Sequence, residues 1–195
     1  MVSFNLFTSS PMMNRLRPAA VIMPLLLSLG ATAQLTVSTQ SNLAQLAASI
    51  TGPGVAISDP QITCHALGYG EFTYSGTQFG VVDQGVLLTS GRITDAIGPN
   101  NAGNTTFQAG TPGDPLLNLV TGRTTRDACK FEFDVIPQGD SLRFDFVFGS
   151  EEYNEWVGSQ YNDVFGFFIS GPGIVGDPGA GSDHNIALIP GANTL

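Results

Sequence analysis

The chain has 195 residues with 7 Lys and Arg against 16 Asp and Glu, and only 12% of its residues are charged. This low charge, together with 24 Gly and 12 Pro, excludes a coiled coil or a long-helix protein. The formal net charge of -9, with no basic patch, disfavours nucleic-acid binding because phosphate backbones would be repelled. A hydrophobic content of 42% predicts a globular domain with a core.

The N-terminus has the order of features that is typical of a secretory signal peptide. Basic residues precede an apolar stretch at residues 19–29, which ends in Ala-Thr-Ala, and cleavage is predicted after Ala33. A membrane anchor is the alternative, but the apolar run is about half of the roughly 20 residues that a span needs. We therefore predict a signal peptide at residues 1–33, a mature domain at residues 34–195, and no membrane span in the mature chain.

The two cysteines, Cys64 and Cys129, follow this export signal. An even number of cysteines in an exported domain favours a single disulfide, with two separate buried thiols as the alternative. A zinc site is poorly supported, because the histidines are only His65 and His184 and no Cys-x-x-Cys pair is present.

Two short helices are predicted from apolar spacing and capping residues. The first covers residues 42–50, with Asn42 as its N-cap and Gln45 as the partner that completes a capping box. The second follows Asp114, which would cap a helix that begins at Pro115. Both helices are minor elements of the domain.

Strands dominate the rest of the chain. Apolar runs and period-two alternation predict strands at residues 85–90, 130–136, 142–148, 164–170 and 185–189. Short strands separated by turn signals predict an all-β protein, an antiparallel β-sandwich of jelly-roll-like form with one or two short helices.

One pair of strands is predicted to form an antiparallel hairpin. The runs at residues 130–136 and 142–148 are separated by a turn sequence at residues 137–140. Their alternation places phenylalanines on one face, and we expect these rings to share the sandwich interior: Phe131, Phe133, Phe144, Phe146 and Phe148.

Catalytic and nucleotide-binding motifs are weak. The letters of a dinucleotide fingerprint occur at residues 171–176, but the Asp-Pro-Gly-Ala-Gly that follows breaks the helix which that motif needs, so a loop is predicted. Neither histidine lies in a recognisable catalytic motif, and there is no Gly-x-Ser-x-Gly elbow. No catalytic residue is assigned, and we expect no enzyme.

The segment at residues 148–168 concentrates carboxylates, amides and aromatic rings. Its carboxylates are candidate calcium ligands: Glu151, Glu152 and Asp163. Its candidate contact residues for a partner are Tyr153, Asn154, Trp156, Tyr161 and Asn162. The alternatives are a polar loop whose carboxylates cap backbone amides, and a hydrolase that would need a further carboxylate from another strand.

Five motifs carry a family resemblance: FGSEEY at residues 148–153, YNDVFGFFISGPG at 161–173, NIALIPG at 185–191, GVLLTSG at 85–91, and DAC at 127–129 with FEFD at 131–134. Together they resemble the choice-of-anchor L domain of bacterial exported and cell-surface proteins. The resemblance implies a Bacteroidetes-type surface protein and supplies no catalytic residues. The family pattern continues beyond the last motif, so we expect the domain to be incomplete at its C-terminus.

These observations predict a non-enzymatic module, secreted or at the cell surface, for adhesion or ligand binding. Calcium is the only cofactor expected, and the expected partner is an unidentified surface glycan or protein. The competing functions are an extracellular carbohydrate-active hydrolase and a structural spacer in a large surface protein.

Overall fold

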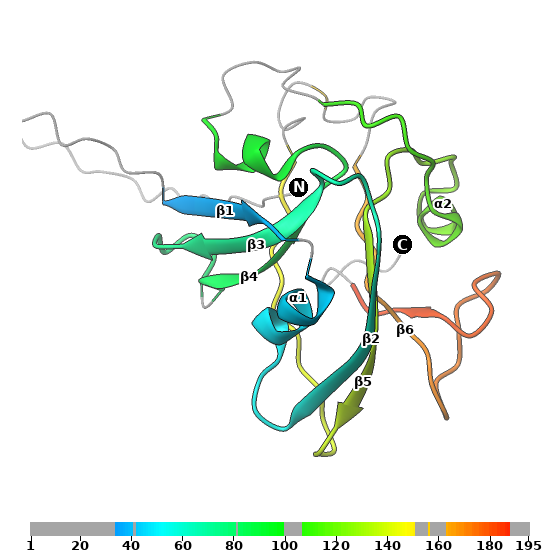
Figure 1. The fold of residues 1–195 in the computed structure, drawn as a ribbon. Helices are drawn as coiled ribbons and strands as arrows, with labels where there is room; N and C mark the ends of the chain where they lie inside the picture. The colour runs from blue at the N-terminus through cyan, green and yellow to red at the C-terminus, as the bar shows by residue number, and fades with distance from the viewer. Residues whose placement is uncertain are drawn as a thin grey trace, which may run out of the picture.

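The computed structural model describes residues 34–40, 42–80, 82–99, 107–150, 156 and 163–187. In these residues antiparallel strands predominate, with short helices between them (Figure 1). The all-β prediction is confirmed. The sheets do not close on one another, so the sandwich arrangement is not confirmed.

The first sheet has three antiparallel strands in the order β1-β3-β4. They are β1 (Leu35–Thr39), β3 (Tyr69–Tyr74) and β4 (Gln84–Leu88). The sequence predicted β4 closely, whereas β1 and β3 were not predicted. β1 has only five residues, and β3 includes Gly70 and Glu71, residue types that are depleted in strands.

Helix α1 (Leu43–Ile50) packs between this sheet and the long strand β2 (Val55–Thr63) (Figure 1). Leu46 has no exposed surface and Ala47 is 6% exposed, so the predicted apolar face of the helix is the buried one. The helix prediction is confirmed.

The N-cap of α1 is confirmed, but only half of the predicted capping box forms. The Asn42 side chain accepts hydrogen bonds from two backbone N–H groups of the first turn, at 3.1 and 3.2 Å. Gln45 does not reach back to Asn42, because its amide donates at 3.0 Å to the Glu71 carboxylate on β3, a charged acceptor. The Asn42 N–H donates instead to Gln40 Oε1 at 2.8 Å.

Strand β2 pairs antiparallel with β5 (Lys130–Pro137), and a bulge between Ser58 and Gln61 interrupts their register. Just beyond the end of this ladder, Cys64 and Cys129 form the predicted disulfide, with their Cα atoms 4.3 Å apart. That spacing fits two residues that face each other across an antiparallel pair.

The predicted hairpin between residues 130–136 and 142–148 is wrong. Strand β5 pairs with β2, and residues 141–150 carry no strand assignment. Alternation identifies the buried face of a strand but not the neighbour that its backbone bonds, and here the disulfide holds β2 beside β5.

Short elements complete the described chain. A 3₁₀ helix covers Ile93–Ile97, and α2 (Pro115–Thr121) begins after Asp114, whose carboxylate accepts from Leu116 N–H at 2.8 Å as predicted. Lys130 ties β5 to this cap, with its Nζ 3.5 Å from Asp114 and 3.1 Å from Glu132. Burial lowers the pKa of Lys130, but the hydrogen bond and charge of Glu132, with Asp114, outweigh it and raise the pKa.

The last strands are shorter than predicted. Strand β6 (Phe168–Ile169) pairs with β7 (His184–Asn185), so residues 164–167 of one predicted strand lie outside the ladder. Residues 188 and 189 of the other lie outside the described residues. Residues 171–176 are a loop with no helix after them in the described chain, which confirms that the fingerprint letters are accidental.

Candidate functional site

Two described segments flank residues 151–162, which the sequence predicts to be a loop and which are called the acidic–aromatic loop here. The aromatic rings of the two segments show that they run antiparallel. Phe144 meets Phe167 edge-on with ring centroids 4.6 Å apart, and Phe146 meets Phe165 at 5.2 Å. A step of two residues forward along the first segment, from Phe144 to Phe146, corresponds to a step of two residues back along the second, from Phe167 to Phe165, as in antiparallel strands. Both segments therefore lead toward the loop.

The described ends of these two segments are joined by a hydrogen bond, in which the Ser150 hydroxyl donates to the Asp163 carboxylate. Beside it, Phe148 lies 5.8 Å from Phe165, centroid to centroid. Of the predicted site, Asp163 and Trp156 fall in the described part of the chain, and Trp156 is 39% exposed. The other predicted site residues lie outside the described residues: Glu151, Glu152, Tyr153, Asn154, Tyr161 and Asn162.

The aromatic rings near the loop are more exposed than a sandwich interior allows. Phe146 is 50% exposed and Phe165 37%, and the neighbouring Val147 is 38% exposed. The expectation that Phe146 lies inside with Phe131 and Phe133 is wrong, because residues 142–148 do not pair with β5 and so are not held against its apolar face. Phe146 and Phe165 form an exposed aromatic pair.

Few cationic groups are available to neutralise the carboxylates of Glu151, Glu152 and Asp163. Arg143 donates to Asp145 from both Nη2 (2.7 Å) and Nε (3.1 Å), so this guanidinium is already engaged by a carboxylate. No group of three or more His, Cys, Asp or Glu side chains that could hold a metal occurs in the described chain. The proposed calcium ligands Glu151 and Glu152 are outside that search.

Comparison with protein families identifies the family of this chain. Residues 34–195 match the family model of the choice-of-anchor L domain. The chain belongs to this family. Choice-of-anchor domains are of a surface-anchoring type and are not a known enzyme family, which indicates a cell-surface or exported protein. Neither a curated protein nor a solved structure matches the chain.

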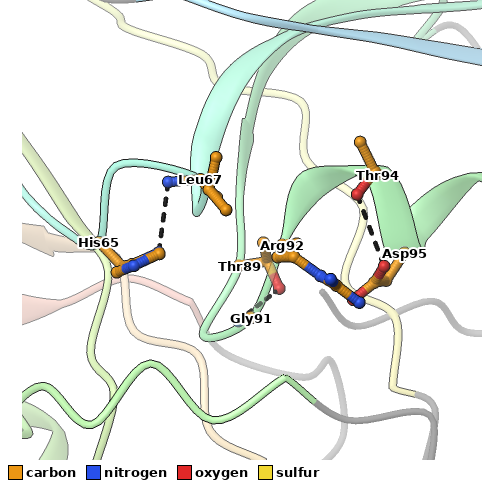
Figure 2. Close-up of polar contacts among 7 residues, drawn as sticks. All are labelled: His65, Leu67, Thr89, Gly91, Arg92, Thr94 and Asp95. Carbon is orange, nitrogen blue, oxygen red and sulfur yellow. Dashed lines mark hydrogen bonds and ion pairs between the residues drawn. The ribbon is translucent and has the colours of Figure 1, made fainter.

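Another cluster of polar contacts in this choice-of-anchor L domain includes Arg92 and His65, the residue after the disulfide-bonded Cys64 (Figure 2). The Arg92 guanidinium stacks 4.9 Å from the centroid of Phe107 and bonds Asp95 at 3.0 Å through Nε. The His65 ring lies 5.2 Å from the same phenylalanine, and its Nδ1 accepts from Leu67 N–H at 3.3 Å. These contacts join three separate segments of the chain, one of them the 3₁₀ helix, so we assign the cluster a structural role.

His184, which lies in no recognisable motif, pairs with Asp177 although its side chain is 42% exposed. His184 Nδ1 lies 2.7 Å from Asp177 Oδ1, and Asp177 Oδ2 accepts from the Asn185 N–H at 2.7 Å. The backbone hydrogen bond from Asn185, with the hydrogen bond and charge of His184, holds the pKa of Asp177 below its usual 3.8. A seven-residue separation gave no sequence signal for this pair.

None of the helices in the described part of the chain has the length and apolar character that a membrane crossing requires.

Proposed function

We propose that this choice-of-anchor L domain is an exported, non-enzymatic binding module that contacts a surface glycan or protein through the acidic–aromatic loop. The observation that carries the proposal is the course of the aromatic rings. They line two antiparallel segments that lead toward the loop, where Phe146 and Phe165 are exposed and Phe148, the ring nearest the loop, is half-buried. Exposed aromatic side chains next to polar groups are characteristic of contact surfaces.

Family membership supports the location of the module. Export through the signal peptide at residues 1–33 would carry it to an oxidising compartment, where the Cys64–Cys129 disulfide is stable. A disulfide that ties residues 65 positions apart suits a domain that works outside the cell.

Calcium is the neutraliser that we propose for Glu151, Glu152 and Asp163. Carboxylates held together repel unless a cation or hydrogen-bond donors compensate them. Arg143, one of the cations nearest in sequence, is engaged by Asp145, and the Ser150 hydroxyl supplies only one donor to Asp163. Calcium accepts six to eight oxygen ligands of this type.

A binding experiment tests the module. Purified full chain is applied to arrays of surface glycans and of extracellular proteins, beside the variants Trp156→Ala and Tyr161→Ala. We expect each variant to lose at least about tenfold in affinity, since a contact aromatic contributes about 2 kcal/mol. The control is Val175→Ala, which trims a side chain that is 84% exposed on another loop and should bind as the parent does. Unchanged binding in both aromatic variants would remove the loop as the contact surface.

Calcium binding has its own measurement. If calcium binds only the folded domain, the melting temperature rises in millimolar calcium and falls when a chelator is added. At a calcium concentration 100-fold above Kd, the free energy of unfolding should increase by about 2.7 kcal/mol. Glu152→Gln should abolish the shift, whereas Asp145→Asn, which alters a carboxylate paired with Arg143, should keep it. A melting curve that ignores both calcium and chelator contradicts the calcium proposal.

A further inference from the structure

Gln34, the residue before β1, is hydrogen-bonded to Ser75, the residue after β3. The Gln34 carbonyl accepts from the Ser75 N–H at 2.8 Å and from the Ser75 hydroxyl at 3.4 Å. Its side-chain Oε1 accepts from the Tyr74 hydroxyl at 3.2 Å. The backbone carbonyl and the side chain thus have separate partners, and the residue as a whole is exposed.

The surroundings of the Gln34 side chain are tightly packed on one side. Tyr74 is 7% exposed and stacks on Phe79 with ring centroids 4.0 Å apart. A Cβ placed on Gly76 would collide with both the Tyr74 hydroxyl and Gln34 Oε1, so a glycine is needed beside this contact. The Tyr74 hydroxyl also lies 3.2 Å from Gln78 Oε1, which is a second acceptor.

We propose that Gln34 is a modification site, and that the mature domain begins with pyroglutamate formed from this residue. The inference rests on the proposed export, because cleavage after Ala33 is the step that frees the Gln34 α-amine. The nitrogen lone pair of this amine attacks the side-chain carbon Cδ. A bond forms from N to Cδ, the bond from Cδ to Nε2 breaks, and Nε2 leaves as ammonia with a proton from the α-amine. The reaction is a condensation that needs neither oxidant nor reductant.

The fold accommodates this product. Cyclisation uses only the α-nitrogen and the side-chain amide, so the carbonyl that accepts from Ser75 is unchanged. If ring closure re-aims Oε1, the Tyr74 hydroxyl keeps Gln78 as an acceptor and is not left unsatisfied. Because Gln34 is exposed, an enzyme or solvent can reach it in the folded domain.

The lactam ring of pyroglutamate would protect the three-stranded sheet from aminopeptidases. Strand β1 lies at the edge of the order β1-β3-β4, so only one side of it is paired, and its first residue, Leu35, is 7% exposed in the core. An aminopeptidase that removed Gln34 and then Leu35 would take a buried side chain from this sheet. A terminus without a free amine resists that attack.

Mass spectrometry of the exported full chain tests the proposal. We expect an N-terminal peptide that starts at residue 34 and is lighter than the unmodified peptide by one molecule of ammonia. It should resist aminopeptidase until pyroglutamyl peptidase is added. In the matched control Gln34→Ala, the same terminus should carry a free amine and be degraded directly.

The failures are distinguishable. A peptide that starts at Gln34 with a free amine overturns the modification and leaves export intact. A chain that retains residues before Gln34, or starts at a different residue, overturns both the cleavage after Ala33 and the modification.

Discussion

The two halves of the described chain use the same alternating patterns, but their side chains are buried to different degrees. Buried hydrophobic side chains of the described residues lie almost entirely in the first half: Leu35, Leu46, Ala47, Tyr74, Leu87 and Ile93, with Ala180 alone in the second. In the first half α1 covers a sheet. In the second, rings such as Phe146 and Phe165 contact each other and stay partly exposed. Alternation therefore orients side chains, and a covering element buries them.

The disulfide gives the largest test of this comparison, because it holds β5, the entry to the second half, against β2. Replacing Cys64 and Cys129 by Ser should lower the free energy of unfolding by about 4 kcal/mol, as expected for a 65-residue separation. Denaturant midpoints measure the loss. Hydrogen exchange should show weaker protection in the β2–β5 ladder and unchanged protection in β1, β3 and β4. If the three-stranded sheet lost its protection first, the role assigned to the disulfide would be wrong.

Truncating one side chain in each half measures the difference in burial directly. Leu46→Ala removes a side chain without exposed surface and should cost about 3 kcal/mol. Phe146→Ala removes a larger side chain that is 50% exposed and should cost about 1 kcal/mol or less. Both values come from urea unfolding of the full chain. A greater loss for Phe146→Ala would show that the second half has a core of its own.

The helix caps offer a smaller effect in the first half. Asn42→Ala leaves two N–H groups of α1 without their side-chain acceptor and should cost about 1 kcal/mol. Asn42→Asp keeps an acceptor oxygen and should restore most of the stability, which thermal unfolding can follow. Equal melting temperatures for the parent and Asn42→Ala would mean that this cap adds nothing.

The smallest effect concerns acid sensitivity in the second half. The pKa of Asp177 is lowered in the folded domain, so its contribution is present above its ordinary pKa of 3.8 and is lost as pH falls through the folded value. NMR titration should show the Asp177 carboxyl and the Asn185 amide shifting together below pH 3.8. In Asp177→Asn this acid transition should disappear. A transition that persists in the variant would assign it to another carboxyl.

Local chemistry determined much that the sequence predicted. Asn42 and Asp114 cap their helices as expected, because a cap depends on residues within one turn. The even cysteine count predicted the disulfide, and the motifs from residue 85 onward identified the family. In the candidate site, sequence reasoning singled out Asp163 and Trp156 by composition alone, without their neighbours.

Tertiary structure decided which segments meet. Strand β5 pairs with β2 across more than 60 residues, Gln45 turns from its own helix cap to Glu71, and Asp177 finds His184. For each of these pairings, the neighbouring sequence offers other partners that would be about equally favourable. The free-energy difference that selects the observed partner comes from contacts between residues far apart in the chain. Composition and periodicity indicate whether a side chain is to be buried or hydrogen-bonded. Which residue it contacts is decided only when distant parts of the chain come together in the fold.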